Sequence, residues 1–418
     1  MEIHLIKQTF NRIGSATIVL VLGKLIQFIL LLQLALFLDA RNFVTFVSAL
    51  AIAQVISLII IPGGQQGLTA KITKVYAKDS FQEMKEILLF SASLYLIFFF
   101  LISFILLVLN IFYNQDILNY IEYFPVILVS VFIVLRTSIT RGFNFIFKSL
   151  FFPEIVAPLF LLFILHFGNP IFELFSFGIV WSCVYFLCEI ISLVICKKPI
   201  FRFLKQSNKD KIIFSMNSFK DMFNIQISNI FLLSIFRLDV VLLSLISGPL
   251  VSAPYVLVNK FVQPLTIMAR ILSNSTAPSI SSLHAINKNS DIKNITFLSF
   301  IFIFVSLAFL ALIILFSFEF IQSYLNSRYE LSYEVLFYLG VAYFLLALCS
   351  PFMQNLLMTK KGNYVALINF IVAIFFYSML AIFNLNVSAI LMSKLVLFSS
   401  FFIAILNTVI FYRLGYIK

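Results

Sequence analysis

The feature that most constrains this chain is a succession of long apolar stretches. A helix needs about 20 apolar residues to cross the hydrocarbon core of a bilayer. About twelve stretches of that order follow one another, at 13–35, 43–65, 87–109, 122–140, 154–166, 174–196, 222–247, 252–276, 295–316, 334–358, 364–383 and 388–411. No loop between them is long enough for a soluble domain. The sequence therefore predicts an all-α polytopic membrane protein with about twelve transmembrane helices.

The amino-acid composition agrees with that prediction. Of the 418 residues, 62% are hydrophobic and 11% are charged, and the mean hydropathy is +1.08. Soluble domains carry about 25% charged residues, and a soluble core could not bury so much apolar surface. The composition therefore excludes a soluble globular protein.

The net charge of +12 is concentrated in alternate loops. When the loops are assigned in turn to the two sides of the membrane, one side has only Arg41 and Arg328 outside the spans. Cytoplasmic loops are enriched in Lys and Arg, so we expect the basic side and both chain termini to be cytoplasmic. A basic surface beside anionic lipid explains the charge better than nucleic-acid binding does. The expected partners therefore include membrane lipids and no nucleic acid.

The spans form two sets of six, separated by a long basic loop. We expect an N-terminal six-helix lobe at 1–196, a basic cytoplasmic linker at 197–221 and a C-terminal six-helix lobe at 222–418. A weak repeat aligns 43–80 with 253–290. Because each set has an even number of spans, the two lobes are expected to be parallel, as in transporters whose substrate site lies between two halves.

Helix-breaking residues interrupt corresponding spans of the two halves. Pro62-Gly63-Gly64 lies in the second span, and Pro254 and Pro264 lie in the eighth. Membrane helices tolerate such residues where neighbouring groups or cavity water satisfy the freed backbone groups. Two interpretations stay open, an ordinary kink and a bendable helix that lets a lobe rock.

Ionisable side chains are concentrated in the segment FRLDVVLLSLISGPLVSAPYVLVNKFVQPLTIMARILSNSTAPSIS, at 236–281. Two apolar stretches meet there at a Gly-Pro turn and carry Arg237, Asp239, Lys260 and Arg270. A charge at the centre of a membrane helix costs about 2.5–3.5 kcal/mol, so such residues usually face a wet or protein-lined cavity. The segment therefore predicts a polar path through the membrane protein.

Basic side chains dominate among these embedded charges. Lys24 lies about 16 Å into the first span, at 1.5 Å per residue. With Arg237, Lys260 and Arg270 it predicts a cationic cavity for an anionic substrate, because Lys and Arg are the usual partners of phosphate oxygens. The alternative is that each cation bonds a carbonyl or carboxylate of a neighbouring helix.

Two embedded carboxylates need a separate explanation. Asp239 is two residues from Arg237, about 200° around a helix, so the two side chains cannot pair on their own helix. Glu189 and Arg136 lie at similar depths and form a candidate buried pair in the first lobe, which we interpret as structural. If transport is coupled to an ion or proton, Asp239 and Glu189 are the candidate residues.

Motifs of the main enzyme classes are missing from the sequence. It has no Walker A loop, no zinc-binding helix, no nucleophile elbow and no carboxylate pair in a large outer loop. The 4 Cys and 3 His show no metal-ligand spacing. We therefore expect no enzymatic activity, no catalytic residue, no metal site and no cofactor.

The segment RLDVVLLSLISGPLVSAPYVLVNK followed by PSIS, the two parallel sets of six spans and the basic central loop resemble a known family. It is the polysaccharide-transport branch of the multidrug/oligosaccharidyl-lipid/polysaccharide exporter superfamily, and within it the Wzx-type flippases of O-antigen or capsule repeat units. The resemblance covers the whole chain in topology, whereas its residue motif is confined to 237–281. It implies a fold like that of the multidrug exporters of the superfamily, the MATE transporters.

The function that this resemblance implies is a flippase in the bacterial inner (cytoplasmic) membrane. It would carry an undecaprenyl-diphosphate-linked oligosaccharide, for O-antigen lipopolysaccharide or capsule biosynthesis, to the outer leaflet by alternating access. A polysaccharide polymerase and chain-length proteins are candidate partners. Positions inside the motif are matched by Arg237, Asp239 and Lys260. The same role is assigned to Lys24 only because of the helix in which it lies. Twelve spans depart from the fourteen of the lipid II flippases, so peptidoglycan precursor is not the expected cargo.

Two alternatives stay open at this point. A multidrug or organic-cation exporter of the same superfamily should have carboxylates rather than cations in its cavity, whereas basic residues outnumber Asp and Glu within the spans here. A membrane polysaccharide polymerase should have a sizeable outer loop with reactive residues, and the longest outer segment, 317–333, is short.

Overall fold

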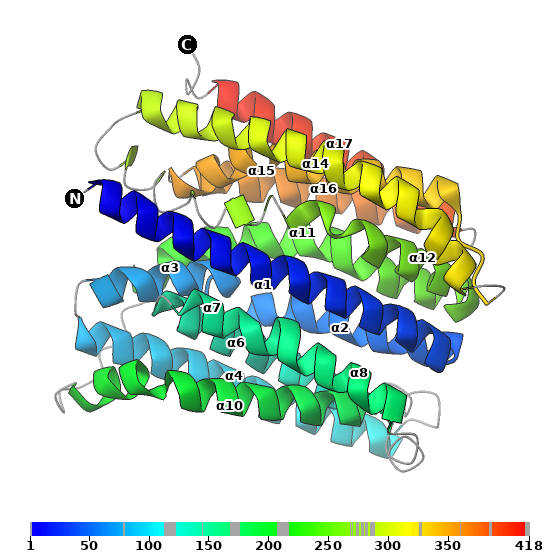
Figure 1. The fold of residues 1–418 in the computed structure, drawn as a ribbon, viewed down its shortest axis with the longest axis horizontal. Helices are drawn as coiled ribbons and strands as arrows, with labels where there is room; N and C mark the ends of the chain where they lie inside the picture. Colours follow the sequence, from blue (N-terminus) through cyan, green and yellow to red (C-terminus); the bar gives the residue numbers. More distant parts are fainter. Residues whose placement is uncertain are drawn as a thin grey trace. The chain divides into compact units, whose positions relative to one another are not determined.

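Helices form all the regular secondary structure in the part of the chain that the computed structural model describes (Figure 1). The described residues are 2–77, 80–112, 123–143, 145–167, 176–206, 217–267, 269, 271–272, 276, 280, 283–284, 289–325, 328–359, 361–383 and 387–413. In the first half the helices are α1 (Glu2–Phe37), α2 (Ala40–Ile60), α3 (Gly64–Ala77), α4 (Phe81–Phe112), α6 (Phe124–Gly142), α7 (Ile146–Phe151), the π-helix η1 (Phe152–Val156), α8 (Ala157–Phe167) and α10 (Phe177–Gln206). In the second half they are α11 (Asn217–Ser247), α12 (Pro249–Val262), α14 (Asn289–Leu325), α15 (Tyr333–Met358), α16 (Gly362–Ile382) and α17 (Ala389–Phe411).

Eleven helical segments in the described residues are long and apolar enough to cross a membrane. The prediction of an all-helical, multi-pass membrane protein is therefore confirmed. The fifth of these segments runs from Phe147 to Phe167, through α7, η1 and α8, and so begins earlier than the expected 154–166. The expected span at 252–276 differs, because α12 ends at Val262 and a turn at Gln263-Pro264 follows it. Pro264 has no backbone N–H with which to continue the helical ladder.

The chain divides into two compact units. Unit 1 consists of Met1–Gln33 and Thr45–Gln226, and unit 2 consists of Leu34–Val44 and Ile227–Lys418. The predicted linker 197–221 lies in unit 1 and partly outside the described residues.

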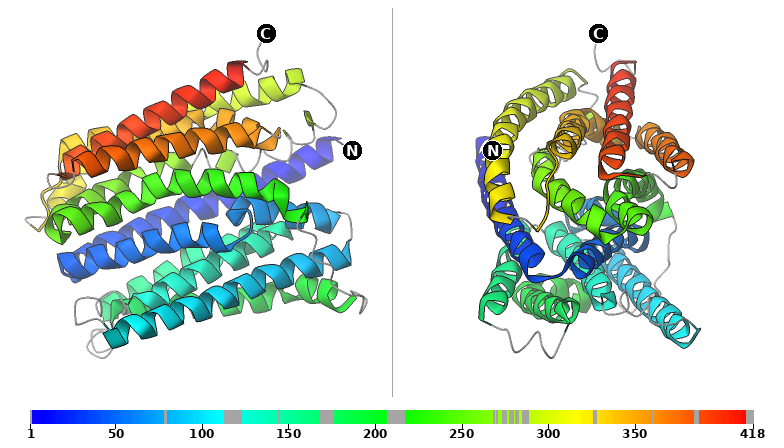
Figure 2. Two further views of the ribbon diagram at one scale, coloured as in Figure 1. Left: turned by 180° about the vertical axis from the view of Figure 1, so that it is seen from behind. Right: turned by 90° about the vertical axis from the view of Figure 1, so that its right-hand side faces the viewer.

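Each unit is built from helices that pack along one another. In unit 1, α6 packs against both α3 and α10, and α4 also packs against α10. In unit 2, α15 packs most extensively against α17, and α14, α12 and α16 also contact α15. Many of these helices are seen nearly end-on in the right-hand view of Figure 2. The core of each unit is therefore a set of helix–helix interfaces.

The outer faces of these helices are strongly apolar. In α14, Phe302, Phe309, Phe316 and Phe320 are all exposed, whereas Leu307 of the same helix is buried. A soluble protein rarely exposes such a continuous apolar face, but a lipid bilayer solvates it. The exposed phenylalanines therefore agree with a lipid-facing surface.

A predicted helix break lies between α2 and α3, at Ile61–Gly63. The side chain of Gln226 bonds the freed backbone on both sides of the break. Its Nε2 donates to the carbonyls of Leu58 at 2.8 Å and Ile59 at 3.0 Å, and its Oε1 accepts from the N–H of Gly63 at 3.1 Å. Membrane helices tolerate a break only where such partners exist. The hydrogen bonds of Gln226 therefore stabilise the break between α2 and α3.

The predicted Gly-Pro turn joins α11 to α12. Gly248 has a φ of 80°, a region that residues with a Cβ rarely adopt. Pro249 follows at the first helical position, where its missing N–H costs nothing. The pair therefore ends one helix and starts the next within a single residue, which places the polar residues of α12 beside those of α11.

Candidate functional site

The predicted site residue Lys24 is part of a small polar cluster in unit 1. Its Nζ lies 2.8 Å from Oε2 of Glu154 and donates to Oε1 of Gln27 at 2.6 Å. The amide of Gln27 donates in turn to Oε2 of Glu154 at 3.0 Å. The side chains of Lys24 and Glu154 are 31% and 17% exposed. The three residues are here called the Lys24 cluster. They contain an ion pair that is still partly exposed.

A close approach of two helices brings the Lys24 cluster together. A Cβ at Gly23 would lie 2.7 Å from the Cβ of Glu154 and 2.8 Å from its carbonyl oxygen. Only glycine therefore allows α1 to pack so tightly on η1. Glu154 lies within the π-helical turn, and π-helical turns are often found at functional sites. Glu154 is not among the residues that the sequence predicted for the site, although a carboxylate at the edge of a span is a usable signal.

The predicted pair of Arg136 and Glu189 is confirmed. Both side chains are buried in unit 1, on α6 and α10. Nη2 of Arg136 donates to Oε1 of Glu189 at 2.8 Å, and Nε of Arg136 contacts Oε2. This bidentate geometry is the strongest arrangement for a guanidinium and a carboxylate. Both oxygens of Glu189 are therefore occupied.

Asp239 is the centre of a buried hydrogen-bond network in unit 2. Its Oδ2 accepts from the hydroxyl of Tyr255 at 2.6 Å and from the amide of Asn259 at 2.8 Å. Oδ1 of Asn259 accepts in turn from the hydroxyl of Tyr343 at 3.1 Å and from the amide of Gln263 at 2.8 Å. These five residues, the Asp239 network, join α11, α12 and α15. Oδ1 of Asp239 is buried without a hydrogen-bond partner.

Four of these network residues were not singled out in the sequence, although a signal for three of them was present. Tyr255, Asn259 and Gln263 are spaced by four residues, so they lie on one face of a helix within an otherwise apolar stretch. Such a polar stripe facing an embedded carboxylate predicts a hydrogen-bonded network. Tyr343 comes from a distant span, and its spacing gives no comparable signal.

The predicted cationic residues of unit 2 differ in their surroundings. Arg237 is half-buried, and its Nε and Nη1 are buried without a hydrogen-bond partner. Among the described residues, no ion pair joins Arg237 to Asp239, as the helical geometry predicts. Lys260 is half-buried, and both cations are close enough to Asp239 to interact with it electrostatically. Arg270 lies outside the described residues.

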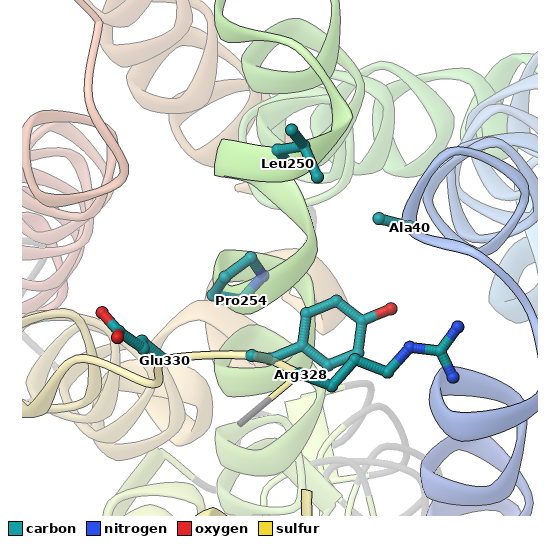
Figure 3. A pocket seen from close by; sticks show the side chains of 6 residues that line it. Ala40, Leu250, Pro254, Arg328 and Glu330 are labelled. Carbon is teal, nitrogen blue, oxygen red and sulfur yellow. The ribbon is translucent and has the colours of Figure 1, made fainter. Parts of the chain in front are cut away.

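The structure also contains a cavity of about 460 Å³ in unit 2, shown in Figure 3. A second cavity of about 270 Å³ shares Pro254 and Glu330 with it and is also lined by Tyr255 of the Asp239 network. Among the described residues, no group of three or more His, Cys, Asp or Glu side chains could hold a metal ion.

Comparison with known proteins identifies the fold. No family model and no curated protein sequence matches the chain. An outward-facing multidrug resistance MATE family transporter of the MOP superfamily superposes with a TM-score of 0.69 at 11% identity, over 96% of this chain and 94% of that one. The MATE transporter VcmN of Vibrio cholerae in the bent form gives 0.63 at 13%, over 99% of both chains. The MATE multidrug transporter DinF-BH gives 0.63 at 16%, over 96% of this chain and 95% of that one.

These likenesses confirm the predicted MATE-like fold over nearly the whole chain. At identities of 11% to 16% they do not extend to substrate or mechanism. Function must therefore be argued from the polar residues of each unit.

Proposed function

We propose that this protein is a flippase of the bacterial inner membrane. Its cargo would be an undecaprenyl-diphosphate-linked oligosaccharide repeat unit of O-antigen or capsule, moved to the outer leaflet by alternating access. The MATE-like fold supports a transporter, because that fold is shared with the transporters to which the chain is similar. The cargo is inferred from the cationic residues and from the family resemblance of the segment 237–281.

Arg237 is the observation that carries this proposal. Two of its guanidinium nitrogens are buried and make no hydrogen bond to the protein. A buried charged donor without a partner is costly, and a bound anion would remove that cost by supplying the partner. A diphosphate supplies several anionic oxygens in the geometry that a guanidinium prefers. Lys260 on the neighbouring helix adds a second positive charge.

Lys24 would contact the anionic head group in a weaker manner. Its charge is already compensated by Glu154 at 2.8 Å. A diphosphate must therefore compete with a carboxylate for the ammonium group. Because the pair is partly exposed, that competition costs little, about 1 kcal/mol or less. Because Glu154 competes for Lys24, the site would bind the head group and also release it.

The membrane potential could drive the proposed transport. A diphosphate diester carries about two negative charges, and an inside-negative potential contributes about 2.3 kcal/mol per charge per 100 mV. If an ion or proton is also coupled, Asp239 is the better candidate of the two predicted carboxylates. Its Oδ1 is buried without a partner, whereas Arg136 occupies both oxygens of Glu189.

A multidrug exporter is the second candidate function. The proteins to which the chain is similar include transporters described as multidrug transporters. Glu154 and Asp239 would then be the residues that attract an organic cation.

Reconstituted liposomes would separate the two functions. We expect the wild-type protein to flip a short-chain prenyl-diphosphate-linked sugar and not to export ethidium. Arg237→Gln should slow flipping by about tenfold, the cost of one charged hydrogen bond of about 1.5 kcal/mol. Lys394→Gln is the matched control, because Lys394 is a cation of α17 that lies 5.2 Å from the ring of Tyr338. Ethidium export without lipid flipping, or unchanged flipping by Arg237→Gln, would overturn the proposal.

A further inference from the structure

The larger cavity of unit 2 has the size of a small-molecule site. Its volume of about 460 Å³ falls within the range of about 300–1,000 Å³ that is usual for ligand pockets. It lies where the start of α12, the start of α2 and the segment before α15 meet, as Figure 3 shows. The lining residues are Ala40, Leu250, Pro254, Arg328, Tyr329 and Glu330.

The cavity has an apolar wall and a polar wall. Leu250 and Pro254 of α12 form the apolar wall, and the consecutive residues Arg328, Tyr329 and Glu330 form the polar one. In Figure 3 the guanidinium of Arg328 and the carboxylate of Glu330 point to opposite sides. A ligand with one apolar face and several polar groups at its rim would match both walls.

Tyr329 provides an unsatisfied polar group at this cavity. The residue is 6% exposed, and its hydroxyl is buried without a hydrogen-bond partner. Burial raises the pKa of this hydroxyl above its usual value, so the group keeps its proton and can both donate and accept. Leaving such a group unpaired is costly, and a ligand hydroxyl would recover that cost.

The backbone of α12 offers a second group of this kind. Pro254 has no N–H to donate to the carbonyl of Leu250 four residues earlier, so that carbonyl has lost its usual helical donor. A ligand hydroxyl is a suitable replacement.

The charges of the cavity argue against a simple ion as its ligand. Arg328 donates to the carbonyl of Leu38 at 3.0 Å and to that of Leu36, which fixes the guanidinium against the end of α1. Glu330 contributes a negative charge to the same cavity. An inorganic anion or cation would meet both signs of charge, whereas an uncharged polyhydroxylated ligand can bond to both groups.

We propose that this cavity binds a pyranose sugar. The apolar face of the ring would pack on Leu250 and Pro254, and its hydroxyls would bond to Tyr329, Arg328 and Glu330. The adjoining cavity of about 270 Å³, lined by Ser332 and Ser388, continues the site past Glu330 and Pro254. That the sugar belongs to the transported repeat unit rests on the proposed function, whereas the chemistry of the cavity does not.

The test is saccharide binding by the full-length protein in nanodiscs. Saturation-transfer NMR would be recorded with a panel of methyl glycosides (gluco, galacto, manno, rhamno and N-acetylglucosamine forms). We expect at least one to bind at millimolar concentration. Tyr329→Phe, which removes the hydroxyl and keeps the ring, should weaken binding about fivefold, as expected for one hydrogen bond. Tyr333→Phe is the matched control, because Tyr333 lies outside the cavity and bonds to Glu319.

A second variant protects the test against a folding defect. Leu250 is 80% exposed, so Leu250→Trp should fold and should fill the cavity mouth, which abolishes binding. If no glycoside binds, or if Tyr329→Phe and Leu250→Trp bind like the wild type, the sugar site is wrong. Binding that depends on Tyr329 in a protein that flips no lipid would support the sugar site and refute the flippase. Flipping without saccharide binding would support the flippase and refute the sugar site.

Discussion

At the scale of single residues, burial decides what each charge can do. Arg136 and Glu189 are buried together in unit 1 and bond to each other through both oxygens of the carboxylate. Such a pair adds little net stability compared with apolar residues, but a buried charge that has lost its partner is strongly destabilising. Arg136 leaves only Nη1 without a hydrogen-bond partner, whereas Arg237, a half-buried cation, leaves both Nε and Nη1 without one and has no carboxylate paired with it among the described residues. We therefore interpret the first arrangement as structural and the second as ligand-binding.

This contrast leads to a prediction for the buried pair. Glu189→Gln should destabilise the folded protein by about 3–5 kcal/mol, because Arg136 keeps its charge and loses its partner. The double variant Arg136→Met with Glu189→Leu should recover most of that stability. Thermal unfolding in detergent measures both effects, and flipping per folded molecule should be unchanged in the double variant. A stable double variant without transport would instead assign Glu189 a coupling role.

At the scale of helices, the breaks are stabilised by side chains from distant positions. Gln226 bonds to the carbonyls of Leu58 and Ile59 and to the N–H of Gly63, so one side chain satisfies three backbone groups at the break between α2 and α3. The break is therefore a fixed part of unit 1, with its own hydrogen-bond partners. This favours the first of the two interpretations of the break, an ordinary kink whose freed backbone groups are satisfied by protein.

The role of Gln226 can be tested by removing its amide. Gln226→Ala should lower the free energy of unfolding by about 1–3 kcal/mol, because the backbone groups at the break then lack partners. Gln82→Ala is the matched control, because Gln82 is an exposed glutamine of α4 in the same unit. Thermal unfolding of both variants in the same detergent provides the measurement. Equal stability of the two variants would show that water replaces the amide and that the break does not depend on Gln226.

Hydropathy and helix breakers predicted most of the helices, because a membrane span is a long local pattern. The Gly-Pro turn at Gly248 and the break at Pro62 follow directly from residue type. The partners of the site residues were harder to find. Glu154 meets Lys24 only because Gly23 allows close packing, and such a contact has no signature in local sequence.

At the scale of the whole molecule, the cationic residues belong to different units. Lys24 is in unit 1, and Arg237 and Lys260 are in unit 2. A cavity that Lys24 shares with Arg237 and Lys260 therefore stays a prediction. The positive charge that these residues bring to each unit follows from the sequence of that unit. What the proposed mechanism requires is that the anionic head group moves while these fixed cations stay with their helices.

Membrane potential offers a test of that requirement. If two negative charges cross the whole field, an outside-positive potential of 100 mV contributes about 4.6 kcal/mol, equivalent to roughly a two-thousandfold accumulation in the outer leaflet. Liposomes with a potassium gradient and valinomycin would set the potential, and leaflet distribution of a labelled prenyl-diphosphate sugar would be measured. Reversing the gradient should reverse the distribution, and a neutral prenyl-linked sugar should show no dependence. A distribution that ignores the sign of the potential would mean that the cations travel with the head group. Co-transport of one proton would leave one negative charge uncompensated and so halve the dependence on potential, and Asp239→Asn should then restore the full dependence.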